Sequence, residues 1–354
     1  MLTGRICRAG VFPGDGRIEV REFPIPDPPP GGAVLQVEAV GLCGSDVGQL
    51  HGVPHLPTGI MFPIVPGHEI VGRIVALAPD AALGVREGDR VGVDEVLTYE
   101  PLLLYGFSDM TGEGRLGLWG GYGEYMQLFA GTRLHRFTAD VAPEELTQFE
   151  PLANALNWVR VAGVQPGQSV VVQGPGHQGL AVLQAALAAG ANPVIVSGAH
   201  NDALRLNAAK AIGAHVTVNV ETDALKTVVA DLTGGRMADV VFDVAPAKQT
   251  FPACFDLVCS RGTVLLAGLK DLKPVEIVSD WIPLKALKVF GGAGYDAESM
   301  AEAVRLLNQG IVDPAVLHGE VFDLDHIADA IALLTRSKPG HDAVRVGLVH
   351  RHRS

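Results

Sequence analysis

The pattern of hydrophobic and polar positions changes near Pro151 and divides the chain into two parts. Before that residue, alternating or β-branched apolar runs are interrupted by proline and glycine, which predicts a β-rich region with few helices. The clearest of these runs are Ala33–Val40, Ile70–Leu77 and Arg90–Val96. From Ser169 onward, short apolar runs alternate with segments of helical periodicity, which predicts a parallel, doubly wound sheet and an α/β fold.

The elements of the second part can be placed by their periodicity. We expect strands at Ser169–Gln173, Pro193–Ser197, His215–Val220, Ala238–Ala245, Thr263–Leu269 and Lys288–Gly291. We expect helices at Gln178–Ala189, Ala203–Ile212 and Thr222–Leu232, with a further helix at Ala297–Asn308. A length of 354 residues also favours two domains.

Composition narrows the class of protein. The chain is 48% hydrophobic and 19% charged, which is typical of a globular protein with a large core. Its formal net charge of −12 argues against nucleic acid or an anionic membrane as a partner, because both require a basic surface. No run approaches the ~20 apolar residues that span a bilayer, and the first ten residues are too polar for a signal peptide. We therefore expect a cytoplasmic protein that acts on small molecules.

Two short phrases contain residues that could bind a metal ion. Cys43 lies in Gly-Leu-Cys-Gly-Ser-Asp, and His68 and Glu69 end Pro-Gly-His-Glu. A thiolate, an imidazole and a carboxylate suit zinc in a catalytic site, which keeps one position open. The other cysteines form no Cys-x-x-Cys pair, so neither a disulfide framework nor a four-thiolate zinc lobe is predicted. They are Cys7, Cys254 and Cys259.

A glycine-rich turn predicts a dinucleotide site. It follows the first predicted strand of the second part, precedes a helix and matches Gly-x-Gly-x-x-Gly. The glycines permit a tight turn and a close approach to a pyrophosphate, which rests on the helix N-terminus. His177, at the start of the helix, is a candidate to bind a phosphate oxygen. The turn consists of Gly174, Pro175, Gly176, His177, Gln178 and Gly179.

The end of the second strand leaves the choice between NAD and NADP open. An acidic residue there would bind the ribose hydroxyls of NAD, but the strand ends at Gly198. The glycine leaves room for the 2′-phosphate of NADP, whereas the nearby Asp202 would repel it. Arg205 is the nearest strong cation. We predict NAD in preference to NADP, by a small margin.

The motifs together resemble those of the zinc-dependent medium-chain dehydrogenase/reductases of the alcohol dehydrogenase superfamily. The Cys43 and His68 phrases, Phe149-Glu150-Pro151-Leu152 and the glycine turn occur in the order and spacing of that family, and most closely resemble its sorbitol and threonine dehydrogenase branch. The resemblance covers essentially the whole chain. It implies a GroES-like catalytic domain over residues 1–155 and a Rossmann domain over residues 156–294. Residues 295–354 would return to the catalytic domain.

The resemblance also assigns roles at the metal site. It implies that Cys43 and His68 bind zinc, with either Glu69 or Glu150 as the third ligand. The hydroxyl of Ser45 would contact the substrate oxygen and start a proton relay. Where the family often has a relay histidine this chain has glycine, so His51 is a candidate to replace it. The segment after Val93 lacks the four cysteines of the family's structural zinc lobe, so we expect one catalytic zinc and no structural zinc.

Further coenzyme contacts follow from the same resemblance. They are expected at the ends of the later strands, at Val244, Gly268, Leu269, Gly291 and Gly292. The family usually pairs through the region before the last strand, which predicts a homodimer or homotetramer. The implied activity is hydride transfer between a secondary or primary alcohol and NAD or NADP, giving a ketone or aldehyde. Two alternatives remain: a zinc-free reductase of an activated C=C bond, and a non-catalytic dinucleotide-binding protein.

Overall fold

The chain forms two compact units. The computed structural model describes residues 4–53, 62–317, 319–338 and 341–351. Met1–Glu150 and Val304–Ser354 form unit 1, and Pro151–Ala303 form unit 2. The divisions fall inside helices α3 (Phe149–Ala162) and α9 (Ala297–Asn308). The predicted limits lie within α3, at residue 155, and just before α9, at residue 294. Within the described ranges, no helix has the length and apolarity that a membrane span requires.

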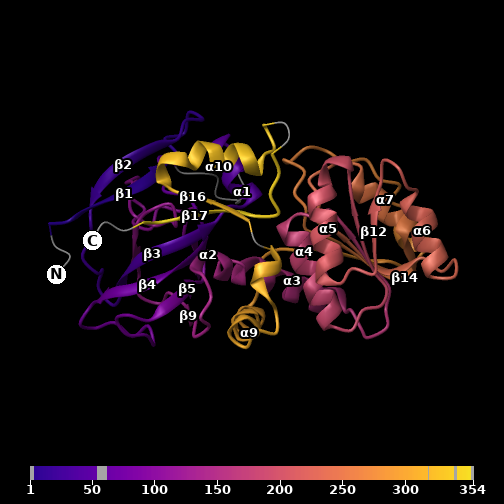
Figure 1. The fold of residues 1–354 in the computed structure, drawn as a ribbon, viewed down its shortest axis with the longest axis horizontal. Coiled ribbons are helices and arrows are strands. Elements are labelled where there is room, and N and C mark those ends of the chain that lie inside the picture. Colours follow the sequence, from indigo (N-terminus) through magenta and orange to yellow (C-terminus); the bar gives the residue numbers. More distant parts are fainter. Residues whose placement is uncertain (1–3, 54–61, 318, 339–340, 352–354) are drawn as a thin grey trace. The chain divides into compact units, whose positions relative to one another are not determined.

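Unit 1 is built on a mixed seven-stranded sheet (Figure 1). Strand β3 pairs with three others and is buried along most of its length. The order is β16 (Glu320–Phe322), β17 (Val346–Val349), β3 (Ala33–Gly41), β4 (Glu69–Leu77), β5 (Arg90–Val93) and β9 (Leu134–Arg136), with β8 (Tyr125–Leu128) paired to β3.

The prediction of a single strand over Arg90–Val96 was wrong at its end. Strand β5 ends at Val93, and β6 begins at Val96. The carboxylate of Asp94 accepts a hydrogen bond from the backbone N–H of Val96 at 3.0 Å, which closes a local turn. The chain then forms a hairpin of β6 (Val96–Tyr99) and β7 (Leu102–Leu104).

The remaining elements of unit 1 cover the sheet. They include the hairpin of β1 (Ile6–Val11) and β2 (Glu19–Pro24), the helices α1 (Gly44–Leu50), α2 (Pro143–Leu146) and α10 (Ile327–Leu334), and the 3₁₀ turns η2 (Pro314–Leu317) and η3 (Leu324–His326). Helix α10, which the hydrophobic pattern did not predict, contributes Ile327 and Ile331 to the main core. It fits closely, since a Cβ on Gly10 would lie 2.5 Å from the Cδ1 of Ile327.

The C-terminal strand brings distant sequence to the start of the Cys43 phrase. Strand β17 runs antiparallel to β3, with Gly347 opposite Gly41. The backbone N–H of Leu42 donates to the carbonyl of Val346 at 2.9 Å. Arg345 therefore lies beside a segment from which it is separated by about three hundred residues.

Unit 2 contains the predicted parallel, doubly wound sheet. Its strand order is β12 (Val216–Asn219), β11 (Val194–Gly198), β10 (Val170–Gln173), β13 (Ala238–Asp243), β14 (Val258–Leu266) and β15 (Lys288–Gly291). All neighbouring pairs are parallel. The order reverses between β10 and β13, and ligands of such sheets bind at the carboxyl ends of the strands at that point.

Several helices that lie in unit 2, or begin there, have bounds close to those predicted. Helices α5 (Ala203–Ile212) and α9 have the predicted bounds, and α4 (His177–Ala188) differs by one residue at each end. The others are η1 (His200–Asp202), α6 (Leu225–Leu232), α7 (Thr250–Leu257) and α8 (Trp281–Leu284).

Two boundaries in unit 2 differ from the prediction for local reasons. Helix α6 begins three residues late because the N–H groups of Thr222 and Asp223 both bond the carbonyl of Asn219 in a turn. Helix α7 contains Pro252 in its first turn, a position that proline tolerates in a helix. Strand β14 follows α7 directly, so it starts at Val258 rather than at Thr263.

Candidate metal centre and coenzyme site

The end of the β3–β4 ladder brings the two metal-binding phrases together. Gly41, the last residue of β3, pairs with Glu69, the first residue of β4. Cys43 follows this pair on one strand and His68 precedes it on the other. Cys43 is the N-cap of α1, and its backbone N–H donates to the carboxylate of Asp46 at 2.9 Å. The antiparallel register and the helix cap therefore position these side chains at one end of the sheet.

Glycines at this end are required by close contacts. Gly67 has φ +95°, and a Cβ there would lie 2.6 Å from the ring of Tyr122. A Cβ on Gly41 would lie 1.9 Å from the Oε2 of Glu69 and 2.4 Å from the guanidinium of Arg345. Each phrase thus places a glycine where a side chain would displace the site.

Cys43, His68 and Glu69 form a compact group of potential metal ligands. Their ligand atoms all lie within 4.8 Å of one another, and among the described residues no fourth histidine, cysteine or carboxylate belongs to the group. His68 and Glu69 are buried. Sulfur, nitrogen and oxygen donors at this spacing fit a zinc ion with an open position.

Glu150 lies near this group without joining it. It is buried in the first turn of α3. Burial lowers the pKa of Arg345, and the negative charges of Glu69 and Glu150 oppose that shift. Arg345 donates a hydrogen bond to Glu69. Glu150 therefore contributes charge around the site, whereas Glu69 belongs to the ligand group itself.

The electrostatics of the group favour a bound cation. Burial disfavours protonation of His68, yet the side chains of Asp46 and Cys43 and the charge of Glu95 raise its pKa well above the ordinary value. The Nδ1 of His68 lies 3.7 Å from the Oδ1 of Asp46. Burial also raises the pKa of Glu69, although Arg345 opposes this. A metal cation would replace the proton that the negative groups retain on His68.

Two residues that sequence reasoning missed lie at this site. Arg345 forms a buried ion pair with Glu69. Glu95 interacts electrostatically with His68, Glu69 and Asp46, and burial raises its pKa to about 7. Glu95 lies in the turn between β5 and β6, two residues after β5 ends. In the sequence, Glu95 lies inside the predicted strand Arg90–Val96, and no motif marks it as a site residue.

Ser45 and His51 occupy the two ends of α1. The Oγ of Ser45 is buried and makes no hydrogen bond to any described residue. His51 is the exposed C-cap of the helix. No hydrogen bond joins the two within the described part of the chain, so Ser45 is available to a ligand and His51 faces solvent.

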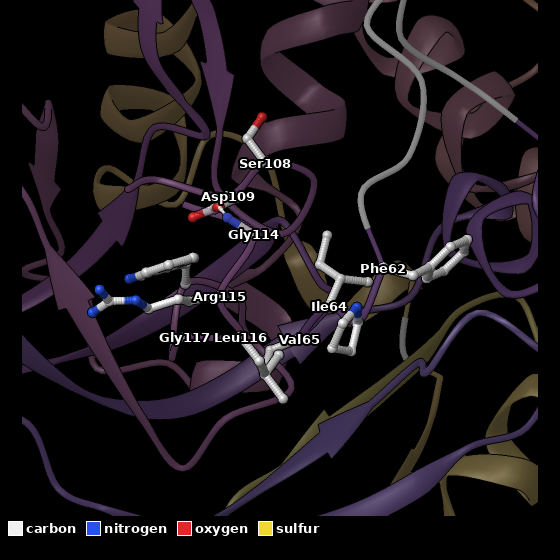
Figure 2. Close-up of a pocket in the computed structure, with 11 residues that line it drawn as sticks. Phe62, Ile64, Val65, Ser108, Asp109, Gly114, Arg115, Leu116 and Gly117 are labelled. Atoms are coloured by element: carbon white, nitrogen blue, oxygen red, sulfur yellow. Dashed lines mark hydrogen bonds between the residues drawn. The ribbon is translucent and has the colours of Figure 1, made fainter. Parts of the chain in front are cut away.

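The cysteine-free lobe is held by polar and apolar contacts. The carboxylate of Asp109 accepts hydrogen bonds from the N–H of Thr111 at 2.9 Å and of Gly114 at 2.6 Å. The ring of Phe107 lies 4.9 Å from that of His68. Trp119 lines a separate hollow, together with Asp109, Arg115 and residues 62–65 (Figure 2). Phe107 therefore borders the ligand group.

The glycine turn of unit 2 has the geometry of a phosphate site. Gly174 has φ +104°, and a Cβ on Gly179 would lie 1.9 Å from the carbonyl oxygen of Gly174. A Cβ on Gly176, the N-cap of α4, would meet only open space among the described residues. The Oε1 of Gln178 is buried without a hydrogen-bond partner in the described chain. His177 opens α4 and is half-buried. The open space and the backbone N–H groups of α4 fit a pyrophosphate.

At the end of β11, an acidic side chain lies against the terminal glycine. The Oδ2 of Asp202 accepts a hydrogen bond from the N–H of Ala199 at 2.8 Å. The same oxygen would lie 2.9 Å from a Cβ on Gly198. Arg205 is half-buried one turn later, in α5. The end of β11, which has no carboxylate of its own, thus lies against the carboxylate of Asp202.

The remaining predicted coenzyme residues lie at the ends of the later strands. Val244 follows β13, and Gly268 and Leu269 follow β14. Leu269 is exposed. Gly291 ends β15, and the N–H of Gly292 donates to the carbonyl of Leu266 at 2.8 Å. All five therefore lie at the carboxyl edge of the sheet, where the glycine turn also lies.

Comparisons with known proteins identify the family. The family model "Alcohol dehydrogenase GroES-like domain" matches residues 29–137, and "Zinc-binding dehydrogenase" matches residues 179–309. A probable alcohol dehydrogenase of Mycobacterium tuberculosis is 35% identical over 96% of this chain and 97% of its own. An L-threonine 3-dehydrogenase of Pyrococcus furiosus is 30% identical over 91% of this chain and 93% of its own. A putative zinc-binding dehydrogenase of Sinorhizobium meliloti, bound to NADP, is 26% identical, with a TM-score of 0.85 over 98% of this chain and all of that one.

The chain therefore belongs to the zinc-dependent medium-chain dehydrogenase/reductases of the alcohol dehydrogenase superfamily. It is an NAD(P)-dependent oxidoreductase that acts on CH–OH groups. The predicted family, the GroES-like and Rossmann folds, and zinc and NAD(P) as cofactors are confirmed. The zinc-free reductase and the non-catalytic protein are not favoured.

Proposed function

We propose that Cys43, His68 and Glu69 bind the catalytic zinc, and that the enzyme there oxidises a secondary or primary alcohol to a ketone or aldehyde. The observation that supports this most directly is the 4.8 Å limit on the separations of their ligand atoms. Glu69 is proposed as the third ligand in preference to Glu150, which lies outside that group. Bound zinc would supply Lewis-acid activation of the substrate oxygen.

The side chains around the ligands would prepare the site for hydride transfer. Asp46 holds the backbone of Cys43 and faces His68, so it orients both ligands. Arg345 orients the carboxylate of Glu69. The buried hydroxyl of Ser45 would accept the proton that the alcohol loses, and His51 would pass it to solvent by way of water. The hydride itself goes to the nicotinamide, so the protein provides geometry and charge.

We also propose NAD rather than NADP as the preferred coenzyme. The carboxylate of Asp202 lies against Gly198, where the adenosine ribose of a Rossmann-bound coenzyme is expected. It would accept hydrogen bonds from the ribose hydroxyls and repel a 2′-phosphate. Comparison of kcat/KM for NAD and NADP in the wild type and in Asp202→Asn tests this. We expect the ratio of kcat/KM for NAD to kcat/KM for NADP to be lower in the variant than in the wild type. An unchanged ratio would contradict the role of Asp202.

The exposed edge of unit 2 supports a homodimer, or a homotetramer built from such dimers. Strand β15 is an edge strand and is exposed at all four positions. Val289 and Phe290 in this strand, and Trp281 and Leu284 before it, are exposed apolar residues. An uncovered edge of this kind favours pairing with a second chain. Light scattering after size exclusion should show a smaller species for Val289→Lys than for the wild type.

Metal content and turnover, measured together, test the zinc site. We expect about one zinc per chain in the wild type and none retained after dialysis in Cys43→Ala or His68→Ala. Both variants should keep the wild-type far-ultraviolet spectrum and lose alcohol oxidation. Cys259→Ala, which changes a half-buried thiol in β14, is the matched control and should keep both zinc and activity. Retention of zinc and turnover by Cys43→Ala would refute the proposed site.

Substitution of each glutamate distinguishes the two possible third ligands. We expect Glu69→Gln to weaken zinc binding by more than Glu150→Gln, because only the first removes a charged oxygen from the ligand group. A competition titration with a chromogenic chelator measures both affinities. A larger loss of zinc affinity in Glu150→Gln would show that Glu150 is the third ligand. The proposed roles of Cys43 and His68 would then stay the same.

A further inference from the structure

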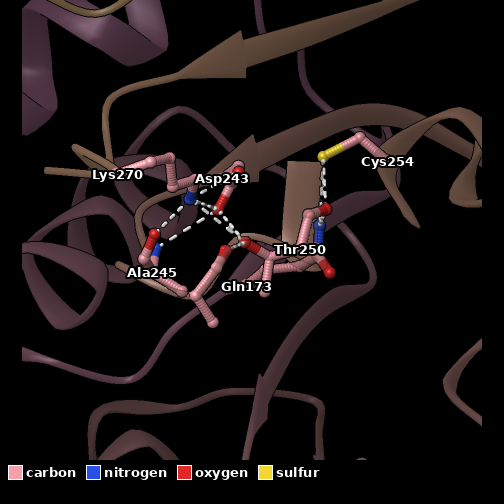
Figure 3. Close-up of polar contacts among 7 residues, drawn as sticks. Gln173, Asp243, Ala245, Thr250, Cys254 and Lys270 are labelled. Carbon is pink, nitrogen blue, oxygen red and sulfur yellow. Dashed lines mark hydrogen bonds and ion pairs between the residues drawn. The ribbon is translucent and has the colours of Figure 1, made fainter. Parts of the chain in front are cut away.

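Unit 2 contains a buried lysine whose contacts all lie at the carboxyl edge of the parallel sheet (Figure 3). The Nζ of Lys270 lies 3.0 Å from the Oδ2 of Asp243 and 3.2 Å from the Oγ1 of Thr250. It also donates to the carbonyl oxygen of Ala245. The side chains of Lys270 and Asp243 are 7% and 0% exposed. Three acceptors match the three N–H groups of an ammonium, so the lysine is engaged entirely within the protein.

The network connects the strands between which the sheet order reverses. Asp243 is the last residue of β13, and its Oδ1 accepts a hydrogen bond from Thr250 at 2.8 Å. Gln173, the last residue of β10, donates from its side chain to the carbonyl of Thr250 at 2.9 Å. Lys270 follows β14. One buried cation therefore connects the carboxyl ends of β10, β13 and β14 through α7.

The backbone that Lys270 holds lies directly against the glycine turn. A Cβ on Gly174 would lie 3.0 Å from the N, Cα and Cβ atoms of Ala245. A Cβ on Gly268 would lie 2.3 Å from the carbonyl oxygen of Ala245. Ala245 is thus packed between the first glycine of the turn and Gly268, which follows β14. Lys270 binds the carbonyl of Ala245, against which Gly268 lies.

Stability alone does not account for such a pair. Removal of two charges from water costs several kcal/mol, and a well-packed apolar pair of similar size often stabilises a fold as well or better. The same pair fixes the backbone at the place where a dinucleotide binds. A displacement of about 1 Å at such a place can reduce the efficiency of an enzyme by about a hundredfold.

We propose that Lys270 is a positioning residue for the coenzyme, which holds Val244 and Ala245 in place for the part of the dinucleotide beyond the pyrophosphate. The inference rests on the coenzyme site proposed for the glycine turn. The adenosine half would lie towards Gly198 and β11, on the other side of that turn. Loss of Lys270 should therefore weaken the binding of the whole dinucleotide more than it weakens the binding of adenosine diphosphate alone.

Binding of two ligands to purified full-length enzyme tests the proposal. The dissociation constants of NADH and of ADP are measured by calorimetry for the wild type and for Lys270→Met. We expect the constant for NADH to rise about tenfold or more and that for ADP to change by less than about twofold. Lys273→Met is the matched control, because Lys273 pairs with Asp271 at the exposed surface and should leave both constants unchanged.

A second variant separates positioning from folding. Lys270→Met leaves the charge of Asp243 buried, so the Asp243→Asn/Lys270→Met double variant restores a neutral pair that can fold even if the single variant cannot. We expect it to bind NADH weakly as well. Unchanged NADH affinity in a folded variant, or equal losses for NADH and ADP, would overturn the proposal. Wild-type binding is measured first, so failure of the coenzyme site itself would be recognised separately.

Discussion

The guanidinium of Arg345 donates a hydrogen bond to the carboxylate of Glu69, although the two residues are 276 positions apart in the chain. Their side chains are 5% and 0% exposed. Strand β17 brings the arginine beside β3, and Gly41 provides the space in which the two charges meet. The third proposed metal ligand is thus held by the residue that directly precedes β17.

Arg345→Met should destabilise the metal-free protein by about 3–5 kcal/mol, because it leaves the Glu69 carboxylate buried without its partner. Urea unfolding in the presence of a chelator measures the change. Arg86→Met is the control, because the side chain of Arg86 is 85% exposed. This change should lower the free energy of unfolding by at most about 1 kcal/mol. Equal stability of Arg345→Met and the wild type would show that the ion pair does not support the site.

The two later glycines of the turn should respond differently to alanine. Gly179→Ala places a Cβ against the carbonyl of Gly174, so we expect a lower melting temperature together with loss of NADH binding. Gly176→Ala meets open space, so stability should stay within about 0.5 kcal/mol of the wild type. It should nevertheless weaken NADH binding, because the methyl group enters the space proposed for the pyrophosphate. Calorimetric titration and thermal melts of both variants check these expectations, and native NADH affinity in Gly176→Ala would place the phosphates elsewhere.

Glu95 should give the metal-free enzyme a distinctive pH dependence. Burial raises its pKa to about 7 in the folded protein, from an ordinary value of 4.5. Between these values the folded state binds more protons than the unfolded chain, so the free energy of unfolding should fall as the pH rises from 4.5 to 7. Glu95→Gln should remove that part of the slope, whereas the exposed Glu87→Gln should not. Parallel slopes for the Glu95 variant and the wild type would contradict this prediction.

Asp109→Ala should loosen the lobe without affecting zinc. The change removes the acceptor for the N–H groups of Thr111 and Gly114, and we expect a loss of about 1–3 kcal/mol. Faster proteolytic cleavage between residues 108 and 117, with an unchanged zinc content, is the expected result. Asp140→Ala, at an exposed position, is the control. A fall in zinc content in Asp109→Ala would show instead that the lobe contributes to a metal site.

The sequence by itself determined the features that depend on local pattern. Alternating strand and helix periods predicted the doubly wound sheet. Elements α5, α9 and β15 have the predicted bounds, and each is followed within two residues by a glycine, which is a turn signal. The glycine turn was also identifiable, since its spacing follows from the backbone geometry of one strand, one turn and one helix.

Only the tertiary structure decided which distant residues share a site. Glu69 and Glu150 are equivalent in the sequence, but the β3–β4 register places the first beside Cys43 and His68. Arg345, Glu95 and Lys270 are ordinary charged residues in the sequence, and burial against partners from other elements gives each its importance. The physical reason is that periodicity reports the face on which a side chain lies, whereas desolvation and pairing depend on what the folded chain places against that face.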